Sequence, residues 1–267
     1  MIHLFFNFYN LKSIPFEKSI KKENLFLSDS IKEFFSRMEY MKQFKGLLLL
    51  TGEAGVGKTT AIRAFLEDLK QDYFKFVYIP LTTVSTTDFY HQLNRSLGGE
   101  NKRSKSELFS SIQKIIVEYA TLRKQIPVII FDEIHFLKND NLFELQMLLN
   151  FNIDSLDPAI VILAGHPLMR ERIIRPSLNS INQRFRLKYE FLPLNRLETA
   201  AYIQHQLNIA GASNMIFNEN AIDAIFNISN GIIRVINNIA TKALILGTSK
   251  KADIITEEHI FSVSTEL

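Results

Sequence analysis

The chain has 267 residues, of which 46% are hydrophobic and 22% charged, as in an ordinary soluble globular protein with one sizeable core and a small second domain. Cysteine is absent, which excludes disulfides, thiolate metal sites and cysteine nucleophiles. The formal net charge of +3 permits a nucleic-acid partner without requiring one.

The first nine residues are apolar, but they lack the basic start and the small-residue cleavage site of a signal peptide. No apolar run of the chain approaches the roughly 20 residues that cross a bilayer. We therefore expect a cytoplasmic protein without membrane contact.

Five short apolar runs predict strands at 46–51, 74–79, 127–131, 159–164 and 187–191. Their continuous apolar character is typical of parallel strands covered on both faces. Helical patterns alternate with them: one helix starts at Lys58, one follows Ser106, and one covers residues 140–150. The second has an apolar face made of Leu108, Ile112, Ile115, Ile116 and Tyr119. This alternation indicates an α/β domain with a parallel sheet between two helix layers.

From residue 195 onwards the patterns predict helices only. Asn195 and Glu198 have the spacing of a capping box, which starts a helix. We expect a helix to end at each of three glycines, Gly211, Gly231 and Gly247. The predicted domains are therefore 1–194 and 195–267.

The first chemical motif begins in the strand at 46–51, which runs into Gly-x-x-x-x-Gly-Lys-Thr and then a helix. Glycines let the backbone wrap around phosphates, while loop amides and the helix N-terminus attract the anion. Lys58 is expected to reach the β- and γ-phosphates of ATP, and the Thr59 hydroxyl to bind Mg²⁺. The predicted ATP-binding residues here are Gly52, Glu53, Ala54, Gly55, Val56, Gly57, Lys58, Thr59 and Thr60.

The second motif is Asp132-Glu133, at the tip of a buried strand where open α/β sheets bind ligands. Asp132 is expected to hold Mg²⁺ through its water shell, and Glu133 to activate the attacking water as general base. Some 70 residues after a phosphate-binding loop, this pair favours an ATP site over a solvated acidic turn. With His135 it also spells a helicase box, but helicases need two tandem motor lobes, which one such loop in 267 residues excludes.

Nearly the whole chain resembles the ExeA/GspA-type AAA+ ATPases and their relatives among transposition helpers (the TniB, TnsC, MuB and IstB types). The matching segments are 8–16, the two motifs above, 163–172, 183–185, 194–203 and 230–237. The resemblance implies an AAA+ P-loop NTPase fold with a five-stranded parallel sheet (an αβα sandwich) and a small all-helical lid. It also implies homo-oligomers that form rings or helical filaments.

The resemblance implies further roles by position. His166 stands where the family has a polar sensor of the γ-phosphate, although a histidine capping a turn is the alternative. Arg184 stands at the arginine-finger position that reaches a neighbour's ATP. Arg234 stands at the second sensor, although Ile233 replaces the usual proline before it. The competitors of Arg184 are Arg172, Arg175 and Arg186.

Pro15 and Phe16 resemble the segment that lines the adenine pocket, and a hydrophobic brace for the core is the alternative. Two basic clusters bear on the target. Residues 95–105 carry a net charge of +3 in a Gly- and Ser-rich loop, and we expect its Lys102, Arg103 and Lys105 to contact DNA phosphates. A solvated loop beside a helix N-cap is the alternative. Residues 166–188 carry a net charge of +5, much of which the subunit interface and ATP would use.

We expect an ATP-dependent, DNA-binding transposition helper that assembles on double-stranded DNA without sequence preference and is released by hydrolysis at Glu133. Its expected partner is a transposase or another recombination protein. The alternatives are a secretion-pathway assembly ATPase and a loader or remodeller of another protein complex. The secretion type normally continues into a transmembrane and periplasmic region, which we do not find before Leu267. The Asp-Glu-Ile-His sequence of the second motif also resembles TniB more than it resembles the Asp-Glu-Ala-Gln sequence of the secretion group.

Overall fold

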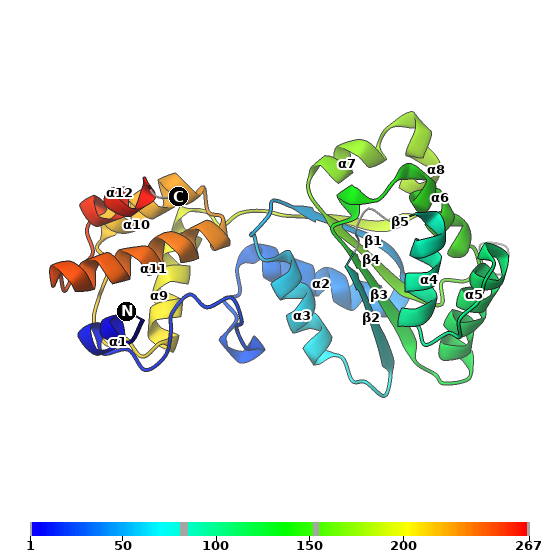
Figure 1. Cartoon of the computed structure of the whole chain (residues 1–267), viewed down its shortest axis with the longest axis horizontal. Helices are drawn as coiled ribbons and strands as arrows, with labels where there is room; N and C mark the ends of the chain where they lie inside the picture. The colour runs from blue at the N-terminus through cyan, green and yellow to red at the C-terminus, as the bar shows by residue number, and fades with distance from the viewer. Residues whose placement is uncertain (1, 81–84, 152–154, 266–267) are drawn as a thin grey trace. The chain divides into compact units, whose positions relative to one another are not determined.

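The computed structural model describes residues 2–80, 85–151 and 155–265 and divides the chain into two compact units (Figure 1). The sheet unit comprises Ile31–Gly52 and Ala61–Phe191. The helical unit comprises Met1–Ser30, Glu53–Thr60 and Leu192–Leu267. None of the described helices has both the length and the apolarity needed to cross a bilayer.

The sheet unit contains five parallel strands in the order β2-β3-β4-β1-β5. In chain order the strands are β1 (Gly46–Gly52), β2 (Phe74–Pro80), β3 (Ile126–Asp132), β4 (Ile160–Gly165) and β5 (Phe185–Phe191). All five predicted strands are confirmed to within two residues. Successive side chains of a strand point to opposite faces of the sheet, so runs that stay apolar throughout identify strands buried on both faces.

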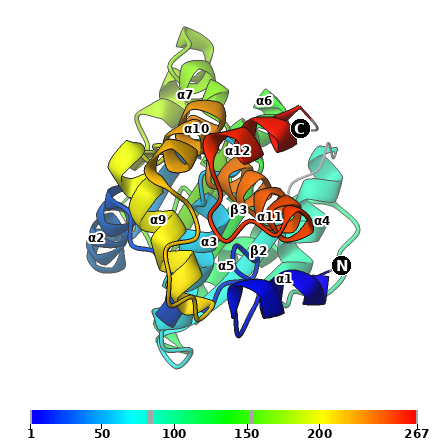
Figure 2. The same ribbon diagram turned by 90° about the vertical axis from the view of Figure 1, so that its left-hand side faces the viewer.

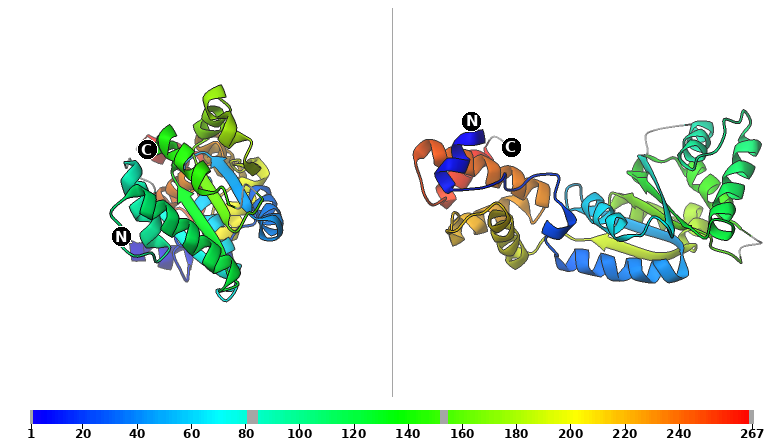
Figure 3. Two further views of the ribbon diagram at one scale, coloured as in Figure 1. Left: turned by 90° about the vertical axis from the view of Figure 1, so that its right-hand side faces the viewer. Right: turned by 90° about the horizontal axis from the view of Figure 1, so that it is seen from below.

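Helices cover both faces of this sheet (Figure 3). On one face, Phe34 of α2 packs against Phe65 of α3 and Phe191 of β5. On the other, Phe131 of β3 joins the buried apolar residues of α4, α5 and α6. The α-helices of this unit are α2 (Asp29–Phe44), α3 (Lys58–Asp68), α4 (Thr86–Ser96), α5 (Lys105–Thr121), α6 (Asn139–Leu148), α7 (Leu168–Ile173) and α8 (Asn179–Asn182). Two short 3-10 helices, η2 (Ile134–Phe136) and η3 (Pro176–Leu178), also belong to it.

The three helices expected between the strands correspond to α3, α5 and α6, and the apolar face of α5 is buried or partly buried as expected. Helix α4 was not expected, although Phe89, Tyr90 and Leu93 give it a buried apolar face. It places Arg95 in a last helical turn, so the basic loop is shorter than 95–105.

The helical unit contains α1 (Ile2–Tyr9), η1 (Lys22–Asn24), α9 (Arg196–Ile209), α10 (Glu219–Ser229), α11 (Ile233–Lys250) and α12 (Glu257–Ser264), shown in Figure 2. The predicted capping box at the start of α9 is confirmed, with Glu198 N–H donating to Asn195 Oδ1 over 2.9 Å. Gly211 and Gly231 follow α9 and α10 with positive φ, as helix-ending glycines do.

The helix stop expected at Gly247 is wrong, because α11 runs through it to Lys250. A Cβ at Gly247 would lie 2.3 Å from both an Ile255 side-chain carbon and the Tyr9 hydroxyl. This glycine therefore serves close packing inside a helix, and Lys251 in the left-handed conformation ends the helix instead.

The N-terminal segment shares its core with α9 to α12, whereas the predicted boundary grouped it with the sheet. Phe5, Tyr9 and Leu11 are buried among the apolar side chains of those helices. Tyr9 also donates a hydrogen bond to the Ala252 carbonyl over 3.0 Å, and the Lys12 N–H to the Ala210 carbonyl over 2.7 Å. The segment thus completes the helical unit, because its aromatic side chains fill that unit's core.

Candidate functional site

The carboxyl ends of β1, β4 and β3 lie next to one another, since β4 separates the other two in a parallel sheet. Gly52 ends β1, Asp132 ends β3 and Gly165 ends β4. The phosphate-binding loop therefore leaves the sheet at the edge that carries Asp132, which is the ligand-binding edge of open α/β sheets.

The loop between β1 and α3 has glycines where the backbone requires them. Gly55 and Gly57 have φ values of 91° and 105°. A Cβ at Gly55 would lie 2.7 Å from the Cβ of Arg234, and the Gly55 carbonyl accepts the backbone N–H of Arg234 over 3.1 Å. Because no side chain caps α11 at Ile232, this carbonyl satisfies one of the helix's free donors. The structure thus places the predicted second sensor beside the loop.

Lys58 lies in the first turn of α3, and its Nζ donates to the carbonyl of Glu53 over 3.0 Å. Thr59 follows with its side chain exposed. A hydroxyl oxygen is a ligand type that suits Mg²⁺. The loop thus carries the donors and the oxygen that phosphate and Mg²⁺ binding need.

Asp132 is almost fully buried, with 5% of its surface exposed. Its Oδ2 accepts the hydroxyl of Tyr78 over 2.9 Å, and its Oδ1 accepts the N–H of Glu133 over 2.9 Å. Burial first, and then the bond to Asp132, raise the pKa of Tyr78 to about 12. A carboxylate fixed in this way fits Mg²⁺, which prefers oxygen ligands and keeps several of its waters.

Glu133 adopts the left-handed conformation, with φ 57° and ψ 37°, directly after the buried strand. This conformation costs a non-glycine residue about 1–2 kcal/mol. The side chain is 59% exposed, and its Oε2 lies 3.4 Å from Nδ1 of His135. The strained turn therefore brings a carboxylate from a buried strand end out to solvent, where an attacking water can be reached.

His166 follows β4, and its backbone nitrogen lies 3.4 Å from Nδ1 of His135. Its own Nδ1 accepts the N–H of Leu168 over 3.3 Å, which is the turn-capping arrangement considered for this histidine. A Cβ at Gly165 would lie 2.8 Å from the Ile134 side chain, so β4 packs directly against η2. The close packing brings His166 next to His135, and the sensor role of His166 stays a prediction.

Tyr78 and His135 are the two residues of this cluster that sequence reasoning missed. Tyr78 sits near the end of an apolar strand, where a hydroxyl is a weak signal without its partner. His135 was considered only as part of a helicase box, although a polar residue two positions after Glu133 was itself a signal.

Arg184 lies at the opposite edge of the sheet. It immediately precedes Phe185, which pairs with Leu47 at the start of β1. The six residue steps from Gly46 to Gly52 span about 20 Å at the usual rise of a strand. Arg184 is therefore too far from the end of β1 to reach the loop of its own chain.

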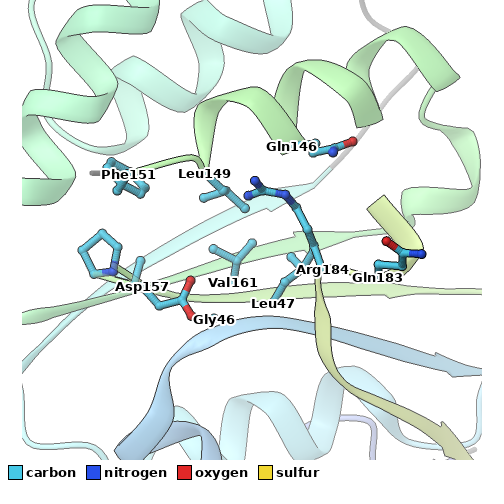
Figure 4. Close-up of a pocket in the computed structure, with 11 residues that line it drawn as sticks. Gly46, Leu47, Gln146, Leu149, Phe151, Asp157, Val161, Gln183 and Arg184 are labelled. Carbon is cyan, nitrogen blue, oxygen red and sulfur yellow. The ribbon is translucent and has the colours of Figure 1, made fainter. Parts of the chain in front are cut away.

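Arg184 lines a hollow of about 230 Å³, and Figure 4 shows its guanidinium extending across it between Leu149 and Gln146. The other residues lining it include Gly46, Asp157 and Gln183. The hollow thus gives this arginine room at an edge where none of the predicted phosphate-binding residues lies.

Two of the three competing arginines, Arg172 and Arg186, make side-chain contacts with named partners. Arg172 donates to Oδ1 of Asn139 over 2.9 Å and to the carbonyl of His135 over 3.4 Å, and burial, followed by the charge of Arg175, lowers its pKa. Arg186 pairs with Asp157 over 2.6 Å. Arg175 is exposed and makes no ion pair within the described ranges.

The predicted DNA-contact residues lie around the start of α5, but most are paired. Lys102 bonds Glu100 over 3.2 Å, and Lys105 bonds Glu144. Arg103 is exposed and has no ion pair within the part of the chain that the structure describes.

Next to these cations, Ser104 and Glu107 form a complete capping box, in which the Ser104 bonds lower the pKa of Glu107. The alternative of a solvated loop beside an N-cap thus describes the local structure. Ser104 therefore acts as the N-cap of α5.

Pro15 and Phe16 are both buried. Phe16 has a positive φ of 63° and packs in the core of the helical unit. The expected alternative of a hydrophobic brace therefore holds for Phe16, and contact with adenine stays a prediction.

Residues 41–173 match the family model of the AAA domain. Over 99% of its length the chain is 27% identical to general secretion pathway protein A of Aeromonas hydrophila, and it spans 48% of that relative. The fold is similar to that of Cdc6p from Pyrobaculum aerophilum, with a TM-score of 0.71, 16% identity, and coverage of 94% of this chain and 70% of that one. It is also similar to the Aeropyrum pernix ORC1 protein, solved in complex with DNA, with a TM-score of 0.63, 15% identity, and coverage of 98% and 68%.

Proposed function

Since this chain is an AAA+ ATPase, we propose that its ATP state controls assembly on double-stranded DNA. The observation that carries the proposal is that the candidate catalytic residues lie at opposite ends of the parallel strands. The acidic pair Asp132 and Glu133 lies at the edge where the phosphate-binding loop begins, and Arg184 lies at the other. An arginine so far from its own loop completes an ATP site only in a neighbouring subunit.

The proposed reaction is hydrolysis of the terminal phosphate. Lys58 and the amides of residues 52–60 bind the phosphates, and Pro15 and Phe16 border the base. When bound by Thr59 and Asp132, Mg²⁺ offsets the phosphate charge. Glu133 takes a proton from the attacking water, and the oxygen of that water forms a bond to the γ-phosphorus. The bond between the γ-phosphorus and the β,γ-bridging oxygen breaks, which gives ADP and phosphate.

The neighbour's Arg184 supplies positive charge as negative charge develops on the transferred group. His166 and Arg234 respond to the γ-phosphate in the proposed scheme. The contact between Gly55 and Arg234 supports this role, because it already joins the loop to α11. Loss of the phosphate is thereby transmitted to α11.

DNA as the target is supported by the distribution of charge between the units. The sheet unit has 21 Lys and Arg against 17 Asp and Glu, a net charge of +4, while the helical unit has 10 against 11, a net charge of −1. Lys102, Arg103 and Lys105 lie on the basic unit. Exposed ion pairs such as that of Lys102 are worth about 0–1 kcal/mol, so a DNA phosphate readily replaces Glu100.

The test is DNA binding by the purified protein with a non-hydrolysable ATP analogue. We expect binding that requires the nucleotide and does not depend on sequence. If three cations each neutralise one phosphate, affinity falls roughly 40-fold between 50 and 200 mM salt. Binding should survive Glu133→Gln and fail with Lys58→Ala. Absence of DNA affinity at low salt with the analogue would contradict the proposal.

In the proposed role the protein assists a transposase, and co-purification of such a recombinase with the ATP-bound form on DNA tests this. A second candidate, a secretion-pathway assembly ATPase, is favoured by the match of 99% of this chain to general secretion pathway protein A. The end of this sequence does not separate the two, because it spans about half of that relative. Nucleotide-dependent DNA binding favours the first, and its absence favours the second.

A further inference from the structure

His135 lies between Glu133 and the backbone of His166. Its Nδ1 is 3.4 Å from Oε2 of Glu133 and 3.4 Å from the backbone nitrogen of His166. The His135 side chain is 26% exposed, less than half the exposure of Glu133. Within the described ranges, His135 is the one side chain in ion-pair distance of the Glu133 carboxylate.

Its neighbours hold His135 in place. The Phe136 ring lies 4.1 Å from it between centroids, and the Arg172 guanidinium donates to its carbonyl. The close packing of Gly165 at the end of β4 against Ile134 holds η2 in place. The imidazole is therefore the fixed partner of this pair, and the exposed carboxylate is the one with freedom to move.

The two contacts of Nδ1 exclude each other. A ring nitrogen that carries a proton donates to Glu133 and cannot accept from His166. A nitrogen without a proton accepts the His166 N–H and presents a lone pair to the carboxylate, which makes no hydrogen bond there.

We propose that His135 is a positioning residue that holds the Glu133 carboxylate through an Nδ1–H donor. This inference rests on the proposed role of Glu133 as general base. One carboxylate oxygen is bound by His135, which leaves the other to accept the proton of the attacking water. The His166 N–H competes for the same nitrogen, so the end of β4 influences the general base through His135.

The test compares three substitutions by steady-state ATP hydrolysis. Asparagine places its amide close to the Nδ1 position, glutamine places it close to Nε2, and phenylalanine keeps the ring without nitrogen. We expect His135→Gln and His135→Phe to lower kcat on the order of tenfold, because orientation of the base is lost, with KM for ATP within about twofold. His135→Asn should stay within about threefold of the wild type.

Thermal unfolding of each variant and the matched substitution His91→Gln on α4 control for stability. If His135→Asn is as slow as His135→Gln, or if His135→Phe retains the wild-type kcat, the inference is overturned. The Glu133→Gln variant separates the two levels. If Glu133→Gln hydrolyses ATP at the wild-type rate, the proposed role of Glu133 as general base is wrong. If Glu133→Gln is inactive while all His135 variants are fully active, only the positioning role of His135 is wrong.

A spectroscopic measurement tests the donor directly. In the ¹⁵N-labelled protein, Nδ1 of His135 should be protonated in the wild type and lose that proton in Glu133→Ala, where the His166 N–H becomes its remaining partner. The His135→Asn spectrum assigns the signal. An unprotonated Nδ1 in the wild type would overturn the inference.

Discussion

The two ends of the parallel strands differ in the surroundings of their functional side chains. At the carboxyl edge, Asp132 accepts bonds from Tyr78 and from the Glu133 amide, and Glu133 in turn lies against His135. At the amino edge, Arg184 extends over an open hollow. A group that acts within its own chain can be fixed by that chain's packing, whereas a group that serves a neighbour needs accessible space. The edges thus separate the two halves of one proposed catalytic unit.

Among the variants that test this contrast, Arg184→Ala should have the largest effect on activity. We expect its kcat to fall on the order of 10³-fold, because the neighbour's transition state loses its positive charge. ATP binding should change little. Turnover assays on mixtures with Lys58→Ala check the trans role, since the arginine of Lys58→Ala subunits can serve the intact loops of Arg184→Ala subunits. No recovery of activity in the mixture would place Arg184 outside the neighbour's site.

Glu133→Gln breaks the carboxyl edge instead. We expect a loss of kcat on the order of 10²-fold, since the amide cannot take the proton of water, with nucleotide affinity retained. In mixtures with Arg184→Ala it should restore activity just as Lys58→Ala does. Hydrolysis close to the wild-type rate would contradict the assignment of the general base.

Tyr78→Phe gives an intermediate effect at the carboxyl edge. Loss of one hydrogen bond, worth about 1 kcal/mol, removes a donor that competes with Mg²⁺ for the Asp132 carboxylate. The Mg²⁺ concentration for half-maximal ATPase activity should therefore fall roughly fivefold, while kcat at saturating Mg²⁺ stays within about twofold. An unchanged Mg²⁺ dependence would show that this hydroxyl does not compete with the metal.

Asp157→Asn should have the smallest effect and sharpens the amino edge. It releases Arg186 from a partly exposed ion pair, which is worth about 0–1 kcal/mol of folding stability. Because Arg186 is not the proposed finger, kcat should not change. Urea unfolding and turnover assays measure both, and a large loss of kcat would point to Arg186 in place of Arg184.

Sequence patterns predicted the sheet well, because strands such as β3 and β4 are buried on both faces and stay apolar throughout. They missed α4, whose buried face consists of Phe89, Tyr90, Leu93 and Asn94, and they misread Gly247. A glycine that ends a helix and one that admits a neighbouring hydroxyl look alike until Tyr9 is placed beside it. Tertiary packing alone distinguishes them.

The same limit applies to the candidate site. Residues fixed by local spacing, such as Lys58 and Asp132, stand out because the loop and the strand tip demand them. Tyr78 lies 54 residues before the carboxylate that it contacts. No local rule connects the two, since strand pairing between β2 and β3 creates the contact.

The hydrogen bond between Gly55 and Arg234 gives phosphate binding a thermodynamic linkage to the fold of the helical unit. If nucleotide strengthens this contact, a more stable helical unit must raise nucleotide affinity by the same factor. A substitution at Gly231 tests this coupling, because a Cβ there would collide with the Leu194 backbone and destabilise the helical unit. A substitution at Gly231 would therefore weaken ATP binding without altering a single phosphate ligand.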